Sequence, residues 1–321
     1  MTISGMDCAF FYKTIFRLMI QHFSLPASSD TLTLSGIEVV PDSGAPIGIV
    51  QLVHGMCDHK ERYLPFMEFL ASHGYVCVIH DHRGHGASVK CRDDLGYMYS
   101  GGWRAMVEDV HLVNQWIRAT YPGLSLVLFG HSMGSMVVRS YAKRYADSID
   151  RLIVCGCPSY NVATPIAILI ASAYSAVLGE HYRPHLLHWL SFGAFNRPFR
   201  HEGFPQAWVC SDKETLKAYH ADPLCMFNFT ANGYKNLFAL ALDCYSSKDW
   251  TVTNPDMPVC FISGAEDPCR ISDAAFDKAV EMMRRVGYRH VTAKLYPKMR
   301  HEILNETEKA TVWKDVLAFI Q

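Results

Sequence analysis

A serine between two glycines is the residue best placed to do chemistry in this chain. It is Ser132 in the pentapeptide GHSMG at 130–134, which follows an apolar run and precedes a helical pattern. Between a strand and a helix, this G-x-S-x-G pattern is typical of a nucleophilic serine on a sharp turn. A phosphate-binding turn or plain packing is the alternative. We predict that Ser132 is a nucleophile and that Gly130 and Gly134, where a side chain would collide with neighbouring backbone, form its structural elbow.

A serine hydroxyl is a weak nucleophile without a general base, so it needs partners. On alternating strands and helices the partners follow in the order acid, then histidine, each after a late strand. Asp267 ends the loop after a late apolar run, and its neighbour Glu266 is the rival. We prefer Asp267, because a shorter side chain holds an imidazole with less rotational freedom. Among 16 histidines, only His301 lies between the last predicted strand and helix, so we predict that it is the base.

Ester cleavage by such a triad passes through an oxyanion, which requires hydrogen-bond donors. One donor should be the backbone N–H of Met133, which follows the serine at the start of a helix. The other should come from the loop after the first predicted buried strand, VHGMCDH, where Gly55 permits a turn. We expect the N–H of Met56 to be that second donor.

The elements that must position these residues follow from the hydrophobic pattern. Continuous apolar runs closed by glycine or a turn indicate strands buried on both faces. We predict strands over 47–55, 75–86, 124–130, 150–158, 257–268 and 291–297. Helices are predicted over 61–74, 102–123, 132–146, 273–287 and 306–320. The alternation indicates an α/β fold with a mostly parallel central sheet and helices on both faces.

Composition limits the class of protein. The 321 residues are 50% hydrophobic and carry a formal net charge of −1 without a lysine or arginine run, so nothing supports nucleic-acid binding. The 11 cysteines are odd in number and irregularly spaced. That usage is typical of reduced core residues in a cytoplasmic protein.

The N-terminal segment, residues 1–23, is apolar but interrupted by charge. Lys13, Arg17 and Gln21 fall at i, i+4 and i+8, a polar stripe on an amphipathic helix. The charges argue against a secretory signal and against a membrane span. We predict a helix that packs on the body or on a partner, and a peripheral anchor on lipid is the alternative.

Two histidine clusters raise the question of a metal ion. His80 and His82 in HDHRGHG have no obvious second cluster, so we expect them to support a turn near the site. His181, His185 and His188 share a helical face, but a proline interrupts it and no acidic partner is close in sequence. We therefore predict no metal site and no cofactor.

Taken together, these segments resemble the α/β-hydrolase superfamily, and in particular its branch of monoacylglycerol lipases and bacterial lysophospholipases. The similar stretches are VQLVHGMCDHKERY, DHRGHGAS, GHSMGS, SGAEDP and RHEILNE. In that branch the first, third, fourth and last stretches carry an oxyanion N–H, the nucleophile, the acid and the base. The resemblance places these roles on Met56, Ser132, Asp267 and His301, over residues 24–321. It also implies a helical cap that selects the substrate.

The predicted organisation has four parts: the N-terminal amphipathic segment at 1–23, the core halves at 24–158 and 241–321, and a helical cap at 159–240. The cap is inserted after the strand that follows the nucleophile helix and contains no clear strand of its own. Its apolar stretch PIAILIASAYSAVLG suits a substrate with an acyl chain, although the same faces could pack on the core.

The predicted function is a serine hydrolase that cleaves carboxylic esters of single-chain lipids such as monoacylglycerol or lysophospholipids. It proceeds through an acyl-enzyme. Peripheral membrane contact through the N-terminal helix or the cap is a further hypothesis. The alternatives are a small-ester carboxylesterase, an amidase or peptidase, an acyltransferase with the same triad, and a non-catalytic ligand- or partner-binding protein of this fold.

Overall fold

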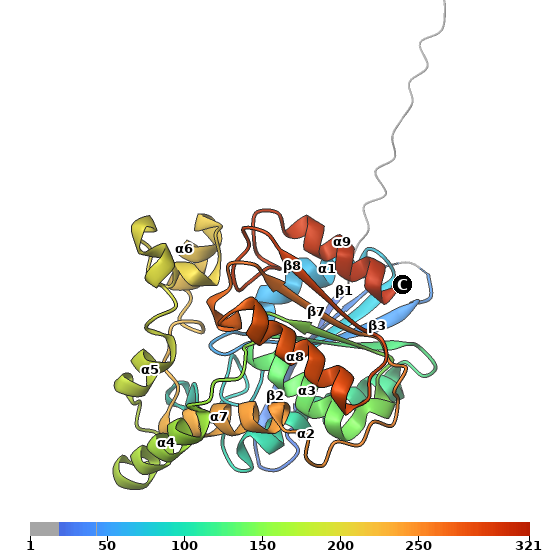
Figure 1. The fold of residues 1–321 in the computed structure, drawn as a ribbon. Coiled ribbons are helices and arrows are strands. Elements are labelled where there is room, and N and C mark those ends of the chain that lie inside the picture. Colours follow the sequence, from blue (N-terminus) through green and yellow to red (C-terminus); the bar gives the residue numbers. More distant parts are fainter. Residues whose placement is uncertain (1–18, 43) are drawn as a thin grey trace, which may run out of the picture.

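One eight-stranded sheet organises the fold, as seen in a computed structural model that describes residues 19–42 and 44–321 (Figure 1). The strands lie in the order β1-β2-β4-β3-β5-β6-β7-β8. Their bounds are β1 Met19–Pro26, β2 Thr33–Val40, β3 Gly48–Val53, β4 Tyr75–His80, β5 Leu126–His131, β6 Arg151–Cys155, β7 Val259–Gly264 and β8 Val291–Tyr296. Strands β3 to β8 pair with one another in parallel. β1 pairs antiparallel with β2, and β2 pairs antiparallel with β4. The predicted mostly parallel sheet is confirmed.

The two antiparallel strands at one edge are absent from the sequence prediction. β1 is largely exposed and pairs with β2 from Met19 opposite Val40 to Pro26 opposite Thr33. The predicted N-terminal helix is therefore wrong for its last residues, because hydrogen bonds to the edge of β2 outweigh the helical spacing of polar residues. The rest of that prediction, residues 1–18, lies outside the described residues.

Helices cover both faces of the sheet, as predicted. The α-helices are α1 Leu64–Ala71, α2 Gly102–Thr120, α3 Met133–Tyr145, α4 Thr164–Leu178, α5 His185–Phe192, α6 Lys213–Ala221, α7 Ala231–Tyr245, α8 Asp273–Val286 and α9 Lys309–Ile320. The short 3₁₀ helices are η1 Lys60–Tyr63, η2 Arg92–Asp94, η3 Ala146–Ser148, η4 Arg197–Glu202, η5 Ala207–Val209 and η6 Pro268–Arg270. α1 and α9 pack on one face, and α2, α3 and α8 pack on the other.

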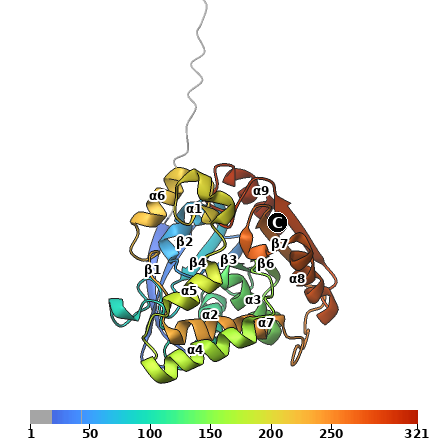
Figure 2. The ribbon, with the colours of Figure 1, turned by 60° about the vertical axis from the view of Figure 1, so that its left-hand side comes forward.

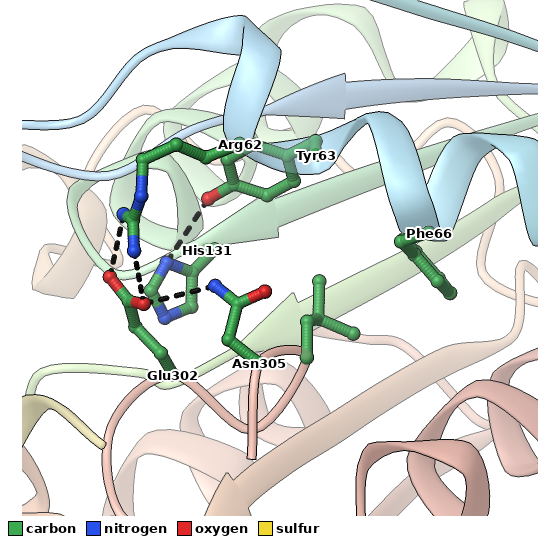
Figure 3. Close-up of a pocket in the computed structure, with 7 residues that line it drawn as sticks. Arg62, Tyr63, Phe66, His131, Glu302 and Asn305 are labelled. Carbon is green, nitrogen blue, oxygen red and sulfur yellow. Dashed lines mark hydrogen bonds and ion pairs between the residues drawn. The ribbon is translucent and has the colours of Figure 1, made fainter. Parts of the chain in front are cut away.

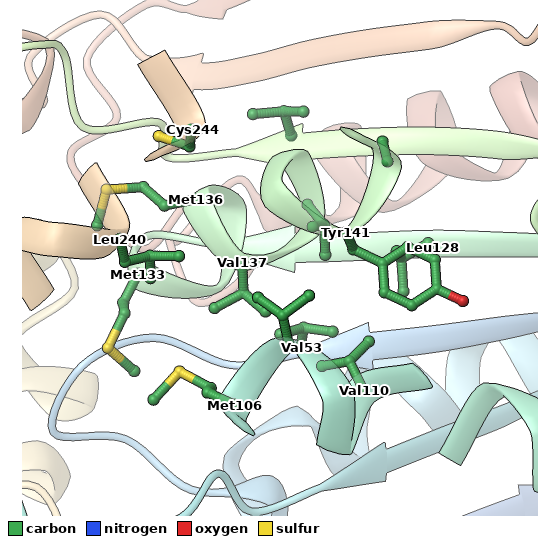
Figure 4. Close-up of a cluster of buried hydrophobic side chains, with 14 of the residues drawn as sticks. Val53, Met106, Val110, Leu128, Met133, Met136, Val137, Tyr141, Leu240 and Cys244 are labelled. Atoms are coloured by element: carbon green, nitrogen blue, oxygen red, sulfur yellow. The ribbon is translucent and has the colours of Figure 1, made fainter. Parts of the chain in front are cut away.

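The larger core lies under the helix that follows the GHSMG turn. Val137 of α3, Val110 of α2 and Leu128 of β5 are fully buried there, in the cluster drawn in Figure 4. Met133 and Met136, from the first turn of α3, fill the end of the same cluster. Burial of these apolar side chains fixes the position of α3 against the sheet, and hence the position of the turn at its N-terminus.

Five helical pieces and the start of α7 lie between β6 and β7, at 159–240. Figures 1 and 2 show α4, α5 and α6 together at one end of the sheet. The predicted end of the cap, residue 240, falls inside α7. α7 is attached to the core, because Arg144 of α3 donates to both carboxylate oxygens of Asp243 at 2.8 Å. No helix within the described ranges is both long enough and apolar enough to cross a membrane.

Candidate active site

The GHSMG turn has the strained backbone that the sequence pattern predicts. Ser132 lies between β5 and α3 with φ 55° and ψ −118°, a conformation that L residues rarely adopt. A Cβ on Gly130 would lie 2.4 Å from the carbonyl oxygen of Gly134, and a Cβ on Gly134 would lie 2.2 Å from the carbonyl oxygen of Val53. Only glycine fits at either position, because backbone atoms occupy the space of a side chain.

The structure brings Ser132, His301 and Asp267 together from three separate loops. Asp267 follows β7, and His301 lies in the loop between β8 and α9. Nε2 of His301 lies 2.8 Å from Oγ of Ser132, and Nδ1 of His301 lies 2.9 Å from Oδ2 of Asp267. Both distances are those of hydrogen bonds, so the hydroxyl, the imidazole and the carboxylate form one continuous hydrogen-bonded chain.

The rival acid does not take part in this chain. Glu266 is exposed, whereas the Asp267 carboxylate is fully buried and accepts hydrogen bonds from the backbone N–H of Cys269 (2.9 Å) and from Oγ of Ser263 (3.2 Å). These donors hold the Asp267 carboxylate toward the imidazole. The preference for Asp267 over Glu266 therefore agrees with the geometry.

Charge pairing sets the protonation of the imidazole and the carboxylate. Burial lowers the pKa of His301, but the adjacent Asp267 carboxylate, with smaller contributions from Glu302 and Asp58, raises the pKa above its usual value. Burial raises the pKa of Asp267, but His301 and the hydrogen bonds from Cys269 and Ser263 bring it below its usual value. The pair therefore favours an ionised carboxylate that stabilises an imidazolium.

The oxyanion donors predicted from the sequence, the N–H groups of Met133 and Met56, belong to two segments that meet at Ser132. Met133 is the first residue of α3, so its N–H is one of the unpaired donors at a helix N-terminus. The loop after β3 approaches Ser132 closely, since a Cβ on Gly55 would lie 3.2 Å from the Ser132 Cβ. The next residue, Met56, is half-buried beside it. The arrangement can present two donors on one side of the serine.

His54 is a site residue that the sequence interpretation missed. Its Nε2 accepts a hydrogen bond from the His82 backbone N–H at 2.9 Å, which assigns the proton to Nδ1. Nδ1–H donates to the Gly55 carbonyl at 2.8 Å. Because the described residues contain no cis peptide bond, the Gly55–Met56 unit is trans and the N–H of Met56 points away from His54. A histidine directly before the turn glycine is visible in the sequence, but its position there does not show that it orients the Gly55–Met56 peptide.

A buried polar network surrounds His131, the residue before Ser132, and several of its members line the pocket shown in Figure 3. Nε2 of His131 lies 3.1 Å from the His301 carbonyl oxygen, and Nδ1 of His131 lies 3.2 Å from the Tyr63 hydroxyl. That hydroxyl lies 2.9 Å from the Asp58 carboxylate. The guanidinium of Arg62 then joins Asp58 to the Glu302 carboxylate. The network links the loop after β3 to the His301 loop.

The two histidine clusters make different contacts. His82 holds the loop after β3, because its Nε2 also lies 3.2 Å from the His54 carbonyl oxygen. Burial lowers the pKa of His80 to about 4, so this residue is neutral near pH 7. His181, His185 and His188 each face a different partner, and they do not converge; the partners are Asp94, Asn228 and Tyr234.

An aromatic wall leads from His301 into the cap. The Trp208 ring centroid lies 5.2 Å from the His301 ring centroid, and Phe195 packs edge-on against Trp208 at 5.1 Å. Phe192 of α5 follows at 5.7 Å from Phe195. These three aromatic side chains are half-buried, so an apolar surface continues from the serine and histidine toward α5.

One cap segment, 197–211, is fastened to the loop that carries the predicted base. Arg300 donates to both carboxylate oxygens of Glu202 in η4. The backbone N–H of Arg300 donates in turn to Oε1 of Glu306 at 2.8 Å, and the same oxygen accepts from the Ser211 N–H at 3.0 Å. The segment therefore sits on the His301 loop through buried, charge-assisted hydrogen bonds.

A mostly parallel sheet with a serine turn after β5, an acid after β7 and a histidine after β8 defines the α/β-hydrolase fold. A family model described as serine aminopeptidase, S33, matches residues 44–308. The chain belongs to this family of α/β hydrolases.

Individual relatives refine that placement. A monoacylglycerol lipase of Mycolicibacterium smegmatis is 26% identical over 295 residues, which cover 89% of this chain and 94% of the relative. A monoglyceride lipase of Homo sapiens is 24% identical over 82% of each chain. A thermostable carboxyl esterase from Bacillus coagulans superposes with a TM-score of 0.86 at 25% identity, over 94% of this chain and 97% of the esterase. The chain is thus an enzyme of the ester-hydrolase type, in the monoacylglycerol lipase-like branch of the superfamily.

Proposed function

We propose that this chain hydrolyses carboxylic esters of single-chain lipids, with monoacylglycerol as the substrate class and Ser132 as the nucleophile. The observation that carries the proposal is the unbroken hydrogen-bonded chain from Ser132 through His301 to Asp267. Its geometry meets the requirement for an activated serine: a base on the hydroxyl, and a third group that orients the base.

In the first half of the reaction, Nε2 of His301 takes the Ser132 proton as Oγ attacks the ester carbonyl carbon. The carbonyl oxygen becomes an oxyanion and accepts hydrogen bonds from the N–H groups of Met56 and Met133. His301 then delivers its proton to the alcohol oxygen as the ester bond breaks. The glycerol leaves, and the acyl group remains on Ser132.

In the second half, water takes the place of the alcohol. His301 removes a proton from the water as its oxygen attacks the acyl carbon, and the oxyanion forms again at the same two N–H groups. The intermediate collapses, the fatty acid leaves, and the proton returns to Ser132. Asp267 stays ionised throughout and stabilises the imidazolium in both halves.

The lipid part of the proposal is supported by the apolar surface around the site. The aromatic wall of Trp208, Phe195 and Phe192 supplies the kind of contact that an acyl chain needs. We assign substrate selection to the cap at 159–240, whose α4 and α5 helices carry half of the exposed large apolar side chains. Two of the relatives above are named for monoacylglycerol or monoglyceride cleavage.

A fluorophosphonate probe tests the nucleophile. We expect the wild-type chain to label and Ser132→Ala to lose both labelling and turnover. Ser135→Ala is a matched control, because Ser135 lies one turn along α3 and its hydroxyl donates to the Ser132 carbonyl oxygen. Equal labelling of wild type and Ser132→Ala would overturn the proposal.

An acyl-chain series tests the substrate class. Hydrolysis of p-nitrophenyl esters from acetate to laurate should be compared with that of 1-acylglycerols. We expect kcat/KM to rise with chain length and 1-acylglycerol to be cleaved. A preference for acetate over octanoate would instead support a small-ester carboxylesterase.

A further inference from the structure

A cluster of nitrogen, sulfur and oxygen donors joins the cap to the core away from Ser132. It consists of His59, from the loop before η1, and of Asp222 and Cys225, from the turn after α6. Their donor atoms all lie within 4.8 Å of one another. Nε2 of His59 lies 2.8 Å from Oδ2 of Asp222. These side chains are mutually close although 163 residues separate His59 from Asp222 in the sequence.

The three side chains are held in place before any ion arrives. Cys225 is buried and its backbone N–H donates to the Asp222 carbonyl at 3.0 Å, so one turn fixes both residues. The His59 side chain is only 7% exposed. Its second nitrogen, Nδ1, lies 2.7 Å from the Glu61 carboxylate. A carboxylate on the far nitrogen of a histidine is the usual partner that orients a metal-binding imidazole.

The charge around this cluster favours a cation. Three carboxylates belong to one connected set of ion pairs with His59; they are Glu61, Asp81 and Asp222. Only one permanent cation, Lys60, faces them in that set. An imidazolium at His59, which has a carboxylate at each ring nitrogen, would add a second positive charge, and a metal ion on Nε2 could supply it instead.

We propose that His59, Asp222 and Cys225 bind one zinc-like divalent ion that cross-links the cap to the core. An imidazole nitrogen, a thiolate and a carboxylate oxygen suit Zn²⁺ and do not suit Mg²⁺ or Ca²⁺. Asp222 retains 28% exposure of its side chain, so water can reach the fourth position of a tetrahedral site.

Binding requires an exchange that balances in charge. The ion displaces the proton between His59 and Asp222 and the thiol proton of Cys225, and both protons go to solvent. Two positive charges leave and two arrive, so the charge of the cluster stays the same. Tetrahedral donors lie roughly 3.3–3.7 Å apart, so Asp222 must move by about half an ångström from its present 2.8 Å contact.

The ion would hold a cap turn that lies against the loop after β3. Phe227, two residues after Cys225, accepts a hydrogen bond from the Cys57 thiol at 3.1 Å through its carbonyl. Cys57 directly follows Met56, the proposed second oxyanion donor. A cross-link at Cys225 therefore restrains the cap beside that donor.

The test is direct metal binding by the full chain. Purified protein is loaded with Zn²⁺, freed of excess ion by gel filtration and assayed by mass spectrometry, while Co²⁺ reports a thiolate ligand through its charge-transfer band. We expect one ion per chain in wild type, a tetrahedral Co²⁺ spectrum, and loss of both in Cys225→Ser and in His59→Gln. Mg²⁺ in excess should leave the Zn²⁺ content unchanged.

Two cysteine variants distinguish this site from other thiols. Cys269→Ser removes the thiol beside Asp267 and His301, the other cluster of donors in the described residues, and Cys91→Ser removes an exposed thiol. Both should keep the ion. Binding that survives in folded Cys225→Ser, or that disappears in Cys269→Ser alone, would overturn the proposal, and so would wild-type protein that retains no ion. If Cys225→Ser fails to fold, His59→Gln and Asp222→Asn decide the question.

Discussion

At the scale of residues, the site combines one strained serine with two buried ionisable partners. The His301 imidazole works as a base only when it is neutral, and Asp267 makes its protonated form more stable. The same carboxylate therefore raises the pH needed for activity while it stabilises the charge that forms in the transition state. This trade-off makes the pH profile a sensitive report on the pair.

The pH profile of kcat/KM should have an acid limb set by His301. Since the pKa of His301 lies above its usual value of 6.5, activity should fall as the pH drops through that raised value. Asp267→Asn removes the charge that raises the pKa, so the limb should move to lower pH, and kcat should fall about 10⁴-fold because the tautomer is no longer fixed. The measurement is kcat/KM for a soluble ester across pH 5–9, a range centred roughly on the imidazole titration.

Glu266→Gln is the matched control for that experiment. Glu266 neighbours Asp267 but is exposed. The pH profile of kcat/KM and the kcat of Glu266→Gln should therefore stay at the wild-type values. Loss of activity in Glu266→Gln with activity kept in Asp267→Asn would show that the wrong acid has been chosen.

A second prediction at this scale concerns His54. His54→Phe removes the donor to the Gly55 carbonyl, so the Gly55–Met56 peptide can turn and its N–H leaves the oxyanion. We expect kcat to fall about 100-fold with KM little changed, the size of effect seen when one oxyanion donor is lost. His80→Phe is the control, because His80 is equally buried but its ring nitrogens have no hydrogen-bond partner among the described residues. Equal kcat values in the two variants would contradict this role.

At the scale of elements, the close approach of α3 to β3 fixes the serine turn. The contact depends on Gly134, where an added Cβ would lie 2.2 Å from the carbonyl oxygen of Val53 and 2.5 Å from that of His54. A methyl group there would push α3 away from the sheet and shift Ser132 relative to His301. Stability and reactivity should therefore change together at this position.

Gly134→Ala should destabilise the fold by about 3 kcal/mol or more, because backbone atoms cannot move aside as side chains can. Urea unfolding measures that loss, and fluorophosphonate labelling measures the displacement of Ser132. Gly123→Ala is the comparison, since no atom lies within 4 Å of its Cβ and only its positive φ of 81° costs about 1 kcal/mol. Equal stability of the two variants would mean that α3 tolerates the shift.

What the sequence could predict at this scale depends on burial. β3, β4 and β5 are buried at every position, so their apolar runs are unbroken and easy to recognise. β1 is exposed at most positions, and Ser35, Gly36 and Glu38 interrupt the apolar residues of β2, so neither strand has such a run and the edge of the sheet was missed. The meeting of Ser132, Asp267 and His301 could be predicted because their places in the strand order are fixed. The direction of the Gly55–Met56 peptide depends on a contact with His54, and no spacing in the sequence encodes it.

At the scale of the whole molecule, the cap presents an apolar outer surface. Leu169 and Val177 of α4 are 70% and 79% exposed, and Trp189 of α5 is 64% exposed. Exposed apolar surface of this extent is a usual feature of contact sites for membranes or partners. We propose that α4 and α5 dock on lipid and bring the site to its substrate.

Replacement of Leu169, Val177 and Trp189 by serine should weaken binding to phosphatidylcholine vesicles at least about 100-fold, since each exposed side chain contributes roughly 1–2 kcal/mol of burial in lipid. Hydrolysis of a soluble short ester should change little. Ile47→Ser is the control, because Ile47 is 60% exposed but precedes β3 at the opposite end of the parallel strands. Unchanged vesicle sedimentation in the triple variant would refute docking through this surface.

The attachment of 197–211 to the His301 loop limits how caps can be exchanged between enzymes of this family. Arg300 and Glu306 belong to the core in sequence, yet they hold Glu202 and Ser211. A chimera that replaces the whole insertion would leave the Arg300 guanidinium buried without its carboxylate and would loosen the loop of the proposed base, His301. The segment to exchange when engineering new specificity is therefore the shorter stretch from 159 to 196. Residues 197–240 should be kept from the same enzyme as Ser132, Asp267 and His301.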